Sequence, residues 1–221
     1  MKQKKIYTEE EYDSLLAYII TQLKRYGMKA TTMDSIANEL HISKRTLYEL
    51  FHSKENMFLK ALEYHCKRMG EIRKEIFETS SNVMEAILKC FVHNRDVMSD
   101  ISVEFLRDIN EYYTIRYLKK DVQKEESRTN HYMLLYDVMS KGVQEGYFRK
   151  DINLSVHCRM FIIQMESLKR MEELFPKDIS LLEVYDSIII GFLRALSTNE
   201  GYRELERFIP LLQSSKAIQS N

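Results

Sequence analysis

Residues 31–58 contain two helix-capping residues, Thr32 and Ser43, each followed by apolar residues at helical spacing. Threonine and serine at such positions accept hydrogen bonds from the first amide groups of a helix, which otherwise have no partner. Only a tight turn fits between the two segments, and Ser53 stands where a further helix would begin. The spacing therefore predicts two short helices joined by a tight turn, with another helix directly after them.

The apolar residues of this region fall on one side of each predicted helix. The inward positions are Ile36, Ala37 and Leu40 in the first helix and Leu47, Leu50 and Phe51 in the second. The other residues of the second helix then lie toward its N-terminal end or on its outer face. This arrangement is typical of a helix-turn-helix, whose second helix enters the major groove of DNA. Double-stranded DNA is therefore the leading predicted partner.

The same positions resemble the N-terminal domain of the TetR family of bacterial transcriptional regulators. The family pattern has paired threonines, then Ile-Ala, Thr-Leu-Tyr, an aromatic residue and a lysine near the next helix start. These positions are Thr31, Thr32, Ile36, Ala37, Thr46, Leu47, Tyr48, Phe51 and Lys54. The resemblance implies a DNA-binding domain over residues 1–65 and a helical domain over residues 66–221 that dimerises and binds a small molecule.

The resemblance also implies roles for individual residues of the DNA-binding domain, residues 1–65, which is called the reader below. Thr32, Tyr48 and Lys54 are expected to contact phosphates, which positions a protein on DNA without specifying sequence. Arg45 is the leading candidate for reading a base, because a guanidinium can bond guanine O6 and N7 together, with Lys44 and Thr46 as neighbours on a base or a phosphate. The alternatives are capping and packing for the first group, and solvated side chains for the second.

Two positions depart from the family pattern. Leu50 stands where a histidine often contacts phosphate, so that contact is not carried over. Glu49 could accept a hydrogen bond from cytosine, or it could screen the site or pair with Lys44 or Arg45. The N-terminal lysines could form an arm along the DNA or a solvated tail; they are Lys2, Lys4 and Lys5.

Net charge gives no indication of a nucleic-acid partner. The chain has 33 basic and 33 acidic residues, and residues 1–56 hold nine basic residues against eight acidic ones. A protein that binds DNA through a general positive field would show an excess of lysine and arginine. Any DNA binding must therefore depend on where the cations stand.

Two prolines and six glycines among 221 residues, together with apolar residues every three or four positions, predict an all-α fold. Within the reader, Thr8 and Glu11 predict a capping box at the start of a first helix, whose apolar stripe is Tyr12, Leu15, Leu16, Ile19, Ile20 and Leu23. The expected helices beyond the reader cover residues 83–98, 101–109, 112–145, 154–175, 181–196 and 203–211. No segment approaches the roughly 20 apolar residues of a membrane helix, and the start lacks an apolar signal core, so a cytoplasmic protein without a membrane partner is expected. The three cysteines are odd in number and widely spaced, which indicates neither a disulfide framework nor a metal site.

The two long helices predicted near the C-terminus are the candidates for a homodimer interface. Gly191 and Ala195 stand four residues apart on one face, so another helix could approach closely there. The family also builds its dimer from the penultimate pair of helices, and a palindromic operator requires a two-fold protein. The predicted interface residues are Ile162, Met165, Ile188, Gly191, Phe192 and Ala195. The alternative is that they form an internal core.

Aromatic and thioether side chains in the middle of the chain are the candidates for an effector pocket. They are Phe105, Tyr112, Tyr113, Tyr117, Tyr132, Tyr136, Phe161 and Met165. Such a lining suits an apolar or aromatic small molecule, although residues of these types at helical spacing are also typical of a core.

An enzyme is not expected, because the sequence contains no convincing nucleophile with its base, paired catalytic carboxylates, metal-ligand spacing or glycine-rich phosphate loop. No cofactor is expected either. The sequence thus predicts a ligand-responsive regulator that represses transcription by binding a palindromic operator as a dimer. The alternative is a helical interaction protein that has the fold without sequence-specific DNA binding.

Overall fold

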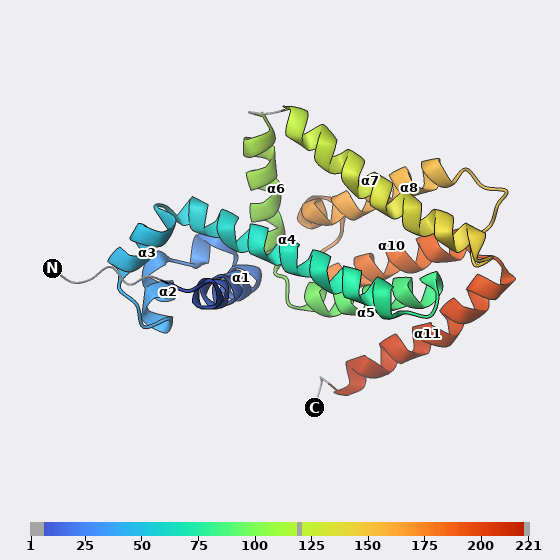
Figure 1. The fold of residues 1–221 in the computed structure, drawn as a ribbon, viewed down its shortest axis with the longest axis horizontal. Helices are drawn as coiled ribbons and strands as arrows, with labels where there is room; N and C mark the ends of the chain where they lie inside the picture. The colour runs from blue at the N-terminus through green and yellow to red at the C-terminus, as the bar shows by residue number, and fades with distance from the viewer. Residues whose placement is uncertain (1–6, 119–120, 219–221) are drawn as a thin grey trace. The chain divides into compact units, whose positions relative to one another are not determined.

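The computed structural model describes residues 7–118 and 121–218, with side chains described for residues 7–111 and 131–210. Over these residues the regular structure is helical (Figure 1). One isolated antiparallel bridge joins Phe148 to Ser197. The all-α fold predicted from the sequence is confirmed.

The chain divides into two compact units. The N-terminal unit comprises residues 1–74 together with residues 100–108, and the C-terminal unit comprises residues 75–99 and 109–221. The sequence placed the boundary near residue 65 and expected the first unit to be continuous. Instead, packing includes the later segment in the N-terminal unit, a contribution with no local signature.

The N-terminal unit is built from α1 (Glu9–Ala30), α2 (Met33–Glu39) and α3 (Lys44–Phe51), with the first part of α4 (Lys54–Thr79) and the start of α6 (Val103–Leu118). Thr8 and Glu11 form the capping box that the sequence predicts at the start of α1. The predicted apolar stripe is buried, at Leu15, Leu16, Ile19, Ile20 and Leu23.

The C-terminal unit contains the last residues of α4, the rest of α6, and the helices α5 (Val83–Ser99), α7 (Asp121–Gln144), α8 (Leu154–Ser167), α9 (Met171–Leu174), α10 (Leu181–Leu196) and α11 (Asn199–Ile218). A short 3-10 segment, Leu168–Arg170, separates α8 from α9. Within this unit α10 packs against both α5 and α8. It is therefore the central helix of the bundle.

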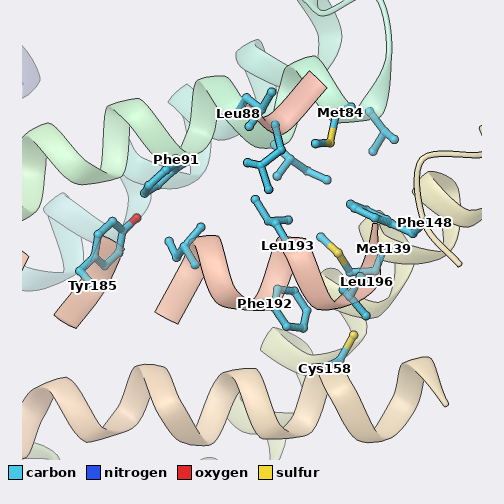
Figure 2. Packing of buried hydrophobic residues seen from close by; sticks show 14 of the residues in the cluster. Met84, Leu88, Phe91, Met139, Phe148, Cys158, Tyr185, Phe192, Leu193 and Leu196 are labelled. Atoms are coloured by element: carbon cyan, nitrogen blue, oxygen red, sulfur yellow. The ribbon is translucent and has the colours of Figure 1, made fainter. Parts of the chain in front are cut away.

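The core of the C-terminal unit forms on both sides of α10 (Figure 2). Leu193 points toward α5, whereas Phe192 points the opposite way, toward Cys158 of α8. Phe192 also packs on Phe161, with 4.3 Å between the ring centroids. Burial of large apolar side chains on two opposite faces explains why α10 reads as apolar on most of its circumference.

Helix boundaries differ from those predicted in α6, α7, α8 and α11. The helix α7 begins at Asp121 instead of residue 112, and α11 ends at Ile218 instead of residue 211. α6 runs on to Leu118, because neither proline nor glycine interrupts residues 110 and 111. The helix predicted over 154–175 ends its regular part at Ser167 and continues as the short segments described above. The final helix begins at Asn199, where the Thr198 hydroxyl accepts a hydrogen bond from the Gly201 amide.

Candidate nucleic-acid interface

The two capping residues predicted from the sequence set the geometry of the helix-turn-helix. The Thr32 hydroxyl accepts from the Ser35 amide at the start of α2, and the Ser43 hydroxyl accepts from the Thr46 amide at the start of α3. Between them His41 adopts a positive φ of 51°, which tightens the turn. Histidine tolerates this left-handed conformation better than most residues do.

Helix α3 buries one face and exposes the other. Leu47 and Phe51 are fully buried, and the Phe51 ring stacks on Tyr12 of α1 with centroids 5.8 Å apart. Leu50, which the sequence also placed inward, is only half-buried. The side chain of Arg45 is 88% exposed, so it projects from the first turn of α3 into solvent. This polarity of the helix matches the one expected of a DNA-reading element.

Both candidate base-reading cations have carboxylate partners. The Arg45 Nε donates to Glu49 Oε1 at 2.8 Å, one helical turn away on α3. The Lys44 Nζ donates to Asp34 Oδ2 at 2.8 Å, which joins α3 to the first turn of α2. These hydrogen bonds raise the pKa of both cations. Of the partners that the sequence left open for Glu49, the structure contains the pair with Arg45; the Asp34 pair was not anticipated.

The remaining reader residues have mixed environments. The Thr46 hydroxyl lies 2.7 Å from the Ser43 hydroxyl, so it takes part in the cap of α3. Tyr48 is exposed, whereas the Lys54 Nζ reaches the Lys29 carbonyl oxygen at 3.4 Å. Thr32 is exposed beside the amide groups that open α2. Thr32 and Thr46 thus take part in helix caps, while Thr32 and Tyr48 are also exposed to solvent. The lysines at positions 2, 4 and 5 lie outside the described residues.

The start of α6 is part of the packing of the N-terminal unit. Phe105 is buried against Phe58 of α4, with ring centroids 6.2 Å apart, so its side chain belongs to the core of this unit. The Ser102 amide donates to the Lys24 carbonyl oxygen at 2.8 Å. The buried Asp108 carboxylate accepts from the Met28 amide. The sequence groups Phe105 with the effector candidates by its residue type and its place in the chain, and no local pattern marks the contact between α6 and α1.

A kink in α1 makes this contact feasible. Gly27 has φ 74° inside the helix, a conformation that other residues adopt at a cost. A β-carbon at Gly27 would lie 2.8 Å from the Glu104 Cβ and 2.9 Å from Asp108 Oδ2. The glycine therefore satisfies two requirements together, the positive φ and the close approach of α6.

The predicted dimer residues separate into two groups. Phe192 is buried within the bundle, and Ile162, Met165 and Ile188 are half-buried. Gly191 and Ala195 are exposed on α10, and nothing lies within 4 Å of the position of a Gly191 β-carbon. The most exposed apolar side chains of α8 are different ones: Val156, Met160 and Ile163 are 46%, 55% and 66% exposed.

The aromatic candidates for an effector site are only partly described. Tyr132 and Tyr136 of α7 are half-buried with ring centroids 5.7 Å apart, and the Tyr132 hydroxyl lies 2.9 Å from that of Ser155. The Arg159 guanidinium stands 4.2 Å from the Tyr132 ring centroid. The side chains of three further candidates are not among those described, namely Tyr112, Tyr113 and Tyr117.

A separate cavity of about 210 Å³ opens between α5 and α11. Its lining combines apolar side chains with charged ones: Asn82, Met84, Glu85, Leu88, Lys89, Glu204 and Phe208. Glu85 carries a pKa lowered to about 2 by its hydrogen bonds to Lys89 and to the Ser81 amide. None of these residues was singled out from the sequence, because contacts between α5 and α11 are distant along the chain.

Within the described residues, no three histidine, cysteine, aspartate or glutamate side chains are grouped so as to hold a metal ion. No described helix is both long and apolar enough to cross a membrane. Cys66 is exposed, Cys90 half-buried and Cys158 buried, and none of these three is joined in a disulfide.

Residues 15–61 match the family model described as bacterial regulatory proteins, tetR family. The chain is 23% identical over 187 residues to the uncharacterised HTH-type transcriptional regulator YvaF of Bacillus subtilis. The alignment covers 84% of this chain and 95% of that protein. It is 24% identical over 156 residues to the HTH-type transcriptional repressor KstR2 of Mycolicibacterium smegmatis, with coverages of 66% and 72%.

Solved structures share the fold across both units. The ketosteroid transcriptional regulator KstR2 of Mycobacterium tuberculosis aligns with a TM-score of 0.58 and 17% identity, covering 89% of this chain and 98% of that one. A regulator from Saccharomonospora viridis in complex with choline aligns with a TM-score of 0.60 and 16% identity, covering 86% and 100%. The capped helix-turn-helix of this chain is that of the TetR family of bacterial transcriptional regulators, and its helical second unit has the fold of their solved structures.

Proposed function

We propose that this protein is a cytoplasmic repressor that binds a palindromic operator as a homodimer and leaves it when a small molecule binds the C-terminal unit. The observation that carries the proposal is the outward face of α3, where Arg45 projects almost fully exposed from a helix whose opposite face is buried. The repressors among the relatives support the direction of regulation.

On DNA, α3 would lie in the major groove with Arg45 reading guanine and Lys44 and Thr46 on an adjacent base or phosphate. Thr32, Tyr48 and Lys54 would contact the backbone. The amide groups at the start of α2 add to the Thr32 hydroxyl, because a helix N-terminus attracts phosphate. The Lys54 ammonium reaches only a carbonyl oxygen at 3.4 Å, so a phosphate would be the stronger partner.

For the dimer, we propose a four-helix contact made by α8 and α10 of each protomer. Gly191 and Ala195 are both exposed on α10, and nothing lies within 4 Å of the position of a Gly191 β-carbon. On α8 the exposed stripe of Val156, Met160 and Ile163 adds the apolar surface that an interface core requires. Ile162 and Met165 would then support the seam from within, and Ile188 would lie at its edge.

For the effector, we propose that Tyr132, Tyr136, Phe161 and Met165 contribute to the site, with an apolar or aromatic ligand. These side chains are half-buried and pack against the core of the C-terminal unit. The structural relative from Saccharomonospora viridis is in complex with choline, so cationic ligands are screened beside apolar ones. A thermal-shift screen of apolar and cationic libraries tests the proposal, since a ligand at 100 times its Kd adds about 2.7 kcal/mol to stability.

Two helices provide a physical route from effector to reader. Both α4 and α6 contribute residues to each unit without an intervening linker. The start of α6 is fastened to α1 at Lys24 and Met28. A ligand that shifts either helix would therefore act on the reader directly, and a coupling of about 1–3 kcal/mol would change operator affinity roughly 5- to 150-fold.

The decisive experiment is selection of bound duplexes from a random DNA pool by the full-length protein. The enriched duplex is then titrated with the wild type and with Arg45→Ala at two salt concentrations. Arg207→Ala is the matched control, because Arg207 is 74% exposed and pairs with Glu204 one helical turn away on α11. We expect a palindrome, weaker binding at higher salt, and relaxed specificity only in Arg45→Ala.

A palindrome bound equally by the wild type and Arg45→Ala would keep the function and move base reading to Lys44, Thr46 or Glu49. No enrichment at any salt concentration would overturn the proposal. That result would instead favour a helical interaction protein that has the fold without sequence-specific DNA binding.

A further inference from the structure

The helix-turn-helix that would face DNA carries as many negative side chains as positive ones. Residues 31–54 contain three cationic side chains, Lys44, Arg45 and Lys54, and three carboxylates, Asp34, Glu39 and Glu49. Two of these carboxylates contact the two cations at the start of α3 directly, each at 2.8 Å. A surface meant to attract phosphate by charge alone would not carry them.

The pair on α3 leaves part of the arginine available. Glu49 binds Arg45 through Nε, the donor nearest the main chain, and the Arg45 side chain is otherwise 88% exposed. The contact with Glu49 is made through Nε, so the two terminal nitrogens of this exposed side chain can bond O6 and N7 of one guanine together. The carboxylate therefore holds the guanidinium without occupying the donors that would read a base.

The same carboxylate opposes contact with the DNA backbone. A phosphate that approaches Arg45 also approaches the negative charge of Glu49, and a phosphate near Lys44 meets that of Asp34. Because both ion pairs are exposed, each is weak and can be exchanged for another partner. The electrostatic cost of bringing DNA up to the Arg45–Glu49 pair is smallest where a guanine offers O6 and N7 as two acceptors in return.

We propose that Glu49 and Asp34 are specificity-determining residues, which neutralise Arg45 and Lys44 toward phosphate and so suppress binding to DNA that lacks the operator bases. This inference rests on the proposed function, since it concerns the same helix in the same groove. The inference goes beyond the proposed function because it assigns the discrimination between operator and other DNA to two acidic residues, Glu49 on α3 and Asp34 on α2.

The consequence is measurable on DNA of unrelated sequence. Non-specific binding comes from phosphate contacts, and each contact adds about 0.9 to the slope of log affinity against log salt. Removing one carboxylate frees one cation for such a contact. We therefore expect Glu49→Gln and Asp34→Asn each to tighten binding to an unrelated duplex about 2- to 5-fold and to steepen its salt dependence by up to about one.

The test uses the full-length protein, the duplex enriched from the random pool, and a duplex of the same base composition in scrambled order. Affinities of the wild type, Glu49→Gln, Asp34→Asn and the double variant are measured on both duplexes across a salt series. Glu71→Gln is the matched control, because it removes the same charge from an exposed pair with Arg68 on α4, within the same unit. Circular dichroism establishes that each variant is folded.

The expected result is tighter binding to the scrambled duplex in both variants, a lower ratio of operator to scrambled affinity, and no change in Glu71→Gln. An unchanged scrambled affinity, or an equal gain in Glu71→Gln, would overturn the inference and leave the proposed function intact. A selective loss of operator binding in Glu49→Gln would also overturn it, because Glu49 would then be reading a base. No enriched duplex for the wild type would remove the proposed function, and this inference with it.

Discussion

The two units use the same ion pair, arginine with a carboxylate, in opposite ways. In the reader, Arg45 and Glu49 are neighbours on one helix and their side chains are 88% and 42% exposed. In the C-terminal unit, Arg95 of α5 binds both carboxylate oxygens of Asp186 on α10, at 3.0 and 3.1 Å, and the side chains are 8% and 20% exposed.

Solvent makes the difference between these pairs. An exposed pair contributes little to folding and can exchange partners, which suits a surface that has to bind DNA. A buried pair cannot be broken cheaply, because either partner left alone is a charge without water. The reader thus keeps its charges available, whereas the bundle uses one pair to fix how α5 and α10 meet.

The largest expected effect follows from the buried pair. Asp186→Asn leaves the Arg95 guanidinium without its counter-charge, so we expect a loss of about 3–5 kcal/mol in the free energy of unfolding. Urea denaturation followed by circular dichroism measures this loss. Asp151→Asn is the control, because it breaks an exposed pair with Arg149 in the same unit and should change little. Similar midpoints for the two variants would show that the Arg95 pair is hydrated.

The contact between α6 and α1 in the N-terminal unit comes next. Gly27→Ala would force a side chain into a positive φ and against Glu104, for a loss of about 2–4 kcal/mol. Gly70→Ala is its control, because Gly70 lies within α4 with nothing within 4 Å of its β-carbon position, and alanine there should stabilise the helix by about 0.5–1 kcal/mol. Equal effects at both glycines would refute the packing role of Gly27.

The exposed apolar face of α8 tests assembly. Ile163→Glu should weaken the dimer by about 1.5–3 kcal/mol per protomer, the value of burying one isoleucine side chain. Light scattering across a concentration series would then show monomers where the wild type is dimeric. Tyr202→Glu on α11, which alters another exposed apolar side chain, should leave the mass unchanged. A dimer that tolerates Ile163→Glu would move the interface away from α8.

The smallest effect on folding is expected at the exposed pair. Glu49→Gln should leave the urea midpoint of the protein unchanged while it alters DNA binding, because solvent screens the pair in the free protein. Denaturation and duplex titration on the same preparation make the comparison direct. A clear loss of stability would mean that Glu49 supports α3 structurally, and the contrast between the two arginine pairs would disappear.

The sequence predicts the reader well because its signals are local. Thr8, Thr32 and Ser43 cap the helices that they were expected to cap, and the buried residues of α1 follow the expected stripe. Each of these features depends on residues three or four positions apart, a spacing that is visible in one chain. The pairing of Arg45 with Glu49 belongs to the same class.

The remaining features depend on residues that are distant in sequence. Nothing near Asp108 indicates that its carboxylate accepts from the Met28 amide, and nothing near Lys44 points to Asp34 on another helix. On α8, apolar residues occupy most of the circumference, so the pattern does not distinguish buried Cys158 from exposed Ile163. Such features follow from tertiary packing, which single-sequence periodicity does not determine.

The helix α4 (Lys54–Thr79) contributes residues to both units without interruption, so its residue count sets a rotation and a length between them. One residue inserted between the units would turn the reader by about 100° about the helix axis and move it about 1.5 Å along that axis. Insertions of three or four residues would leave the angle about 60° or 40° from its original value, whereas seven would leave it about 20° away. Chimeras that exchange the reader among relatives are therefore expected to need the same residue count in α4.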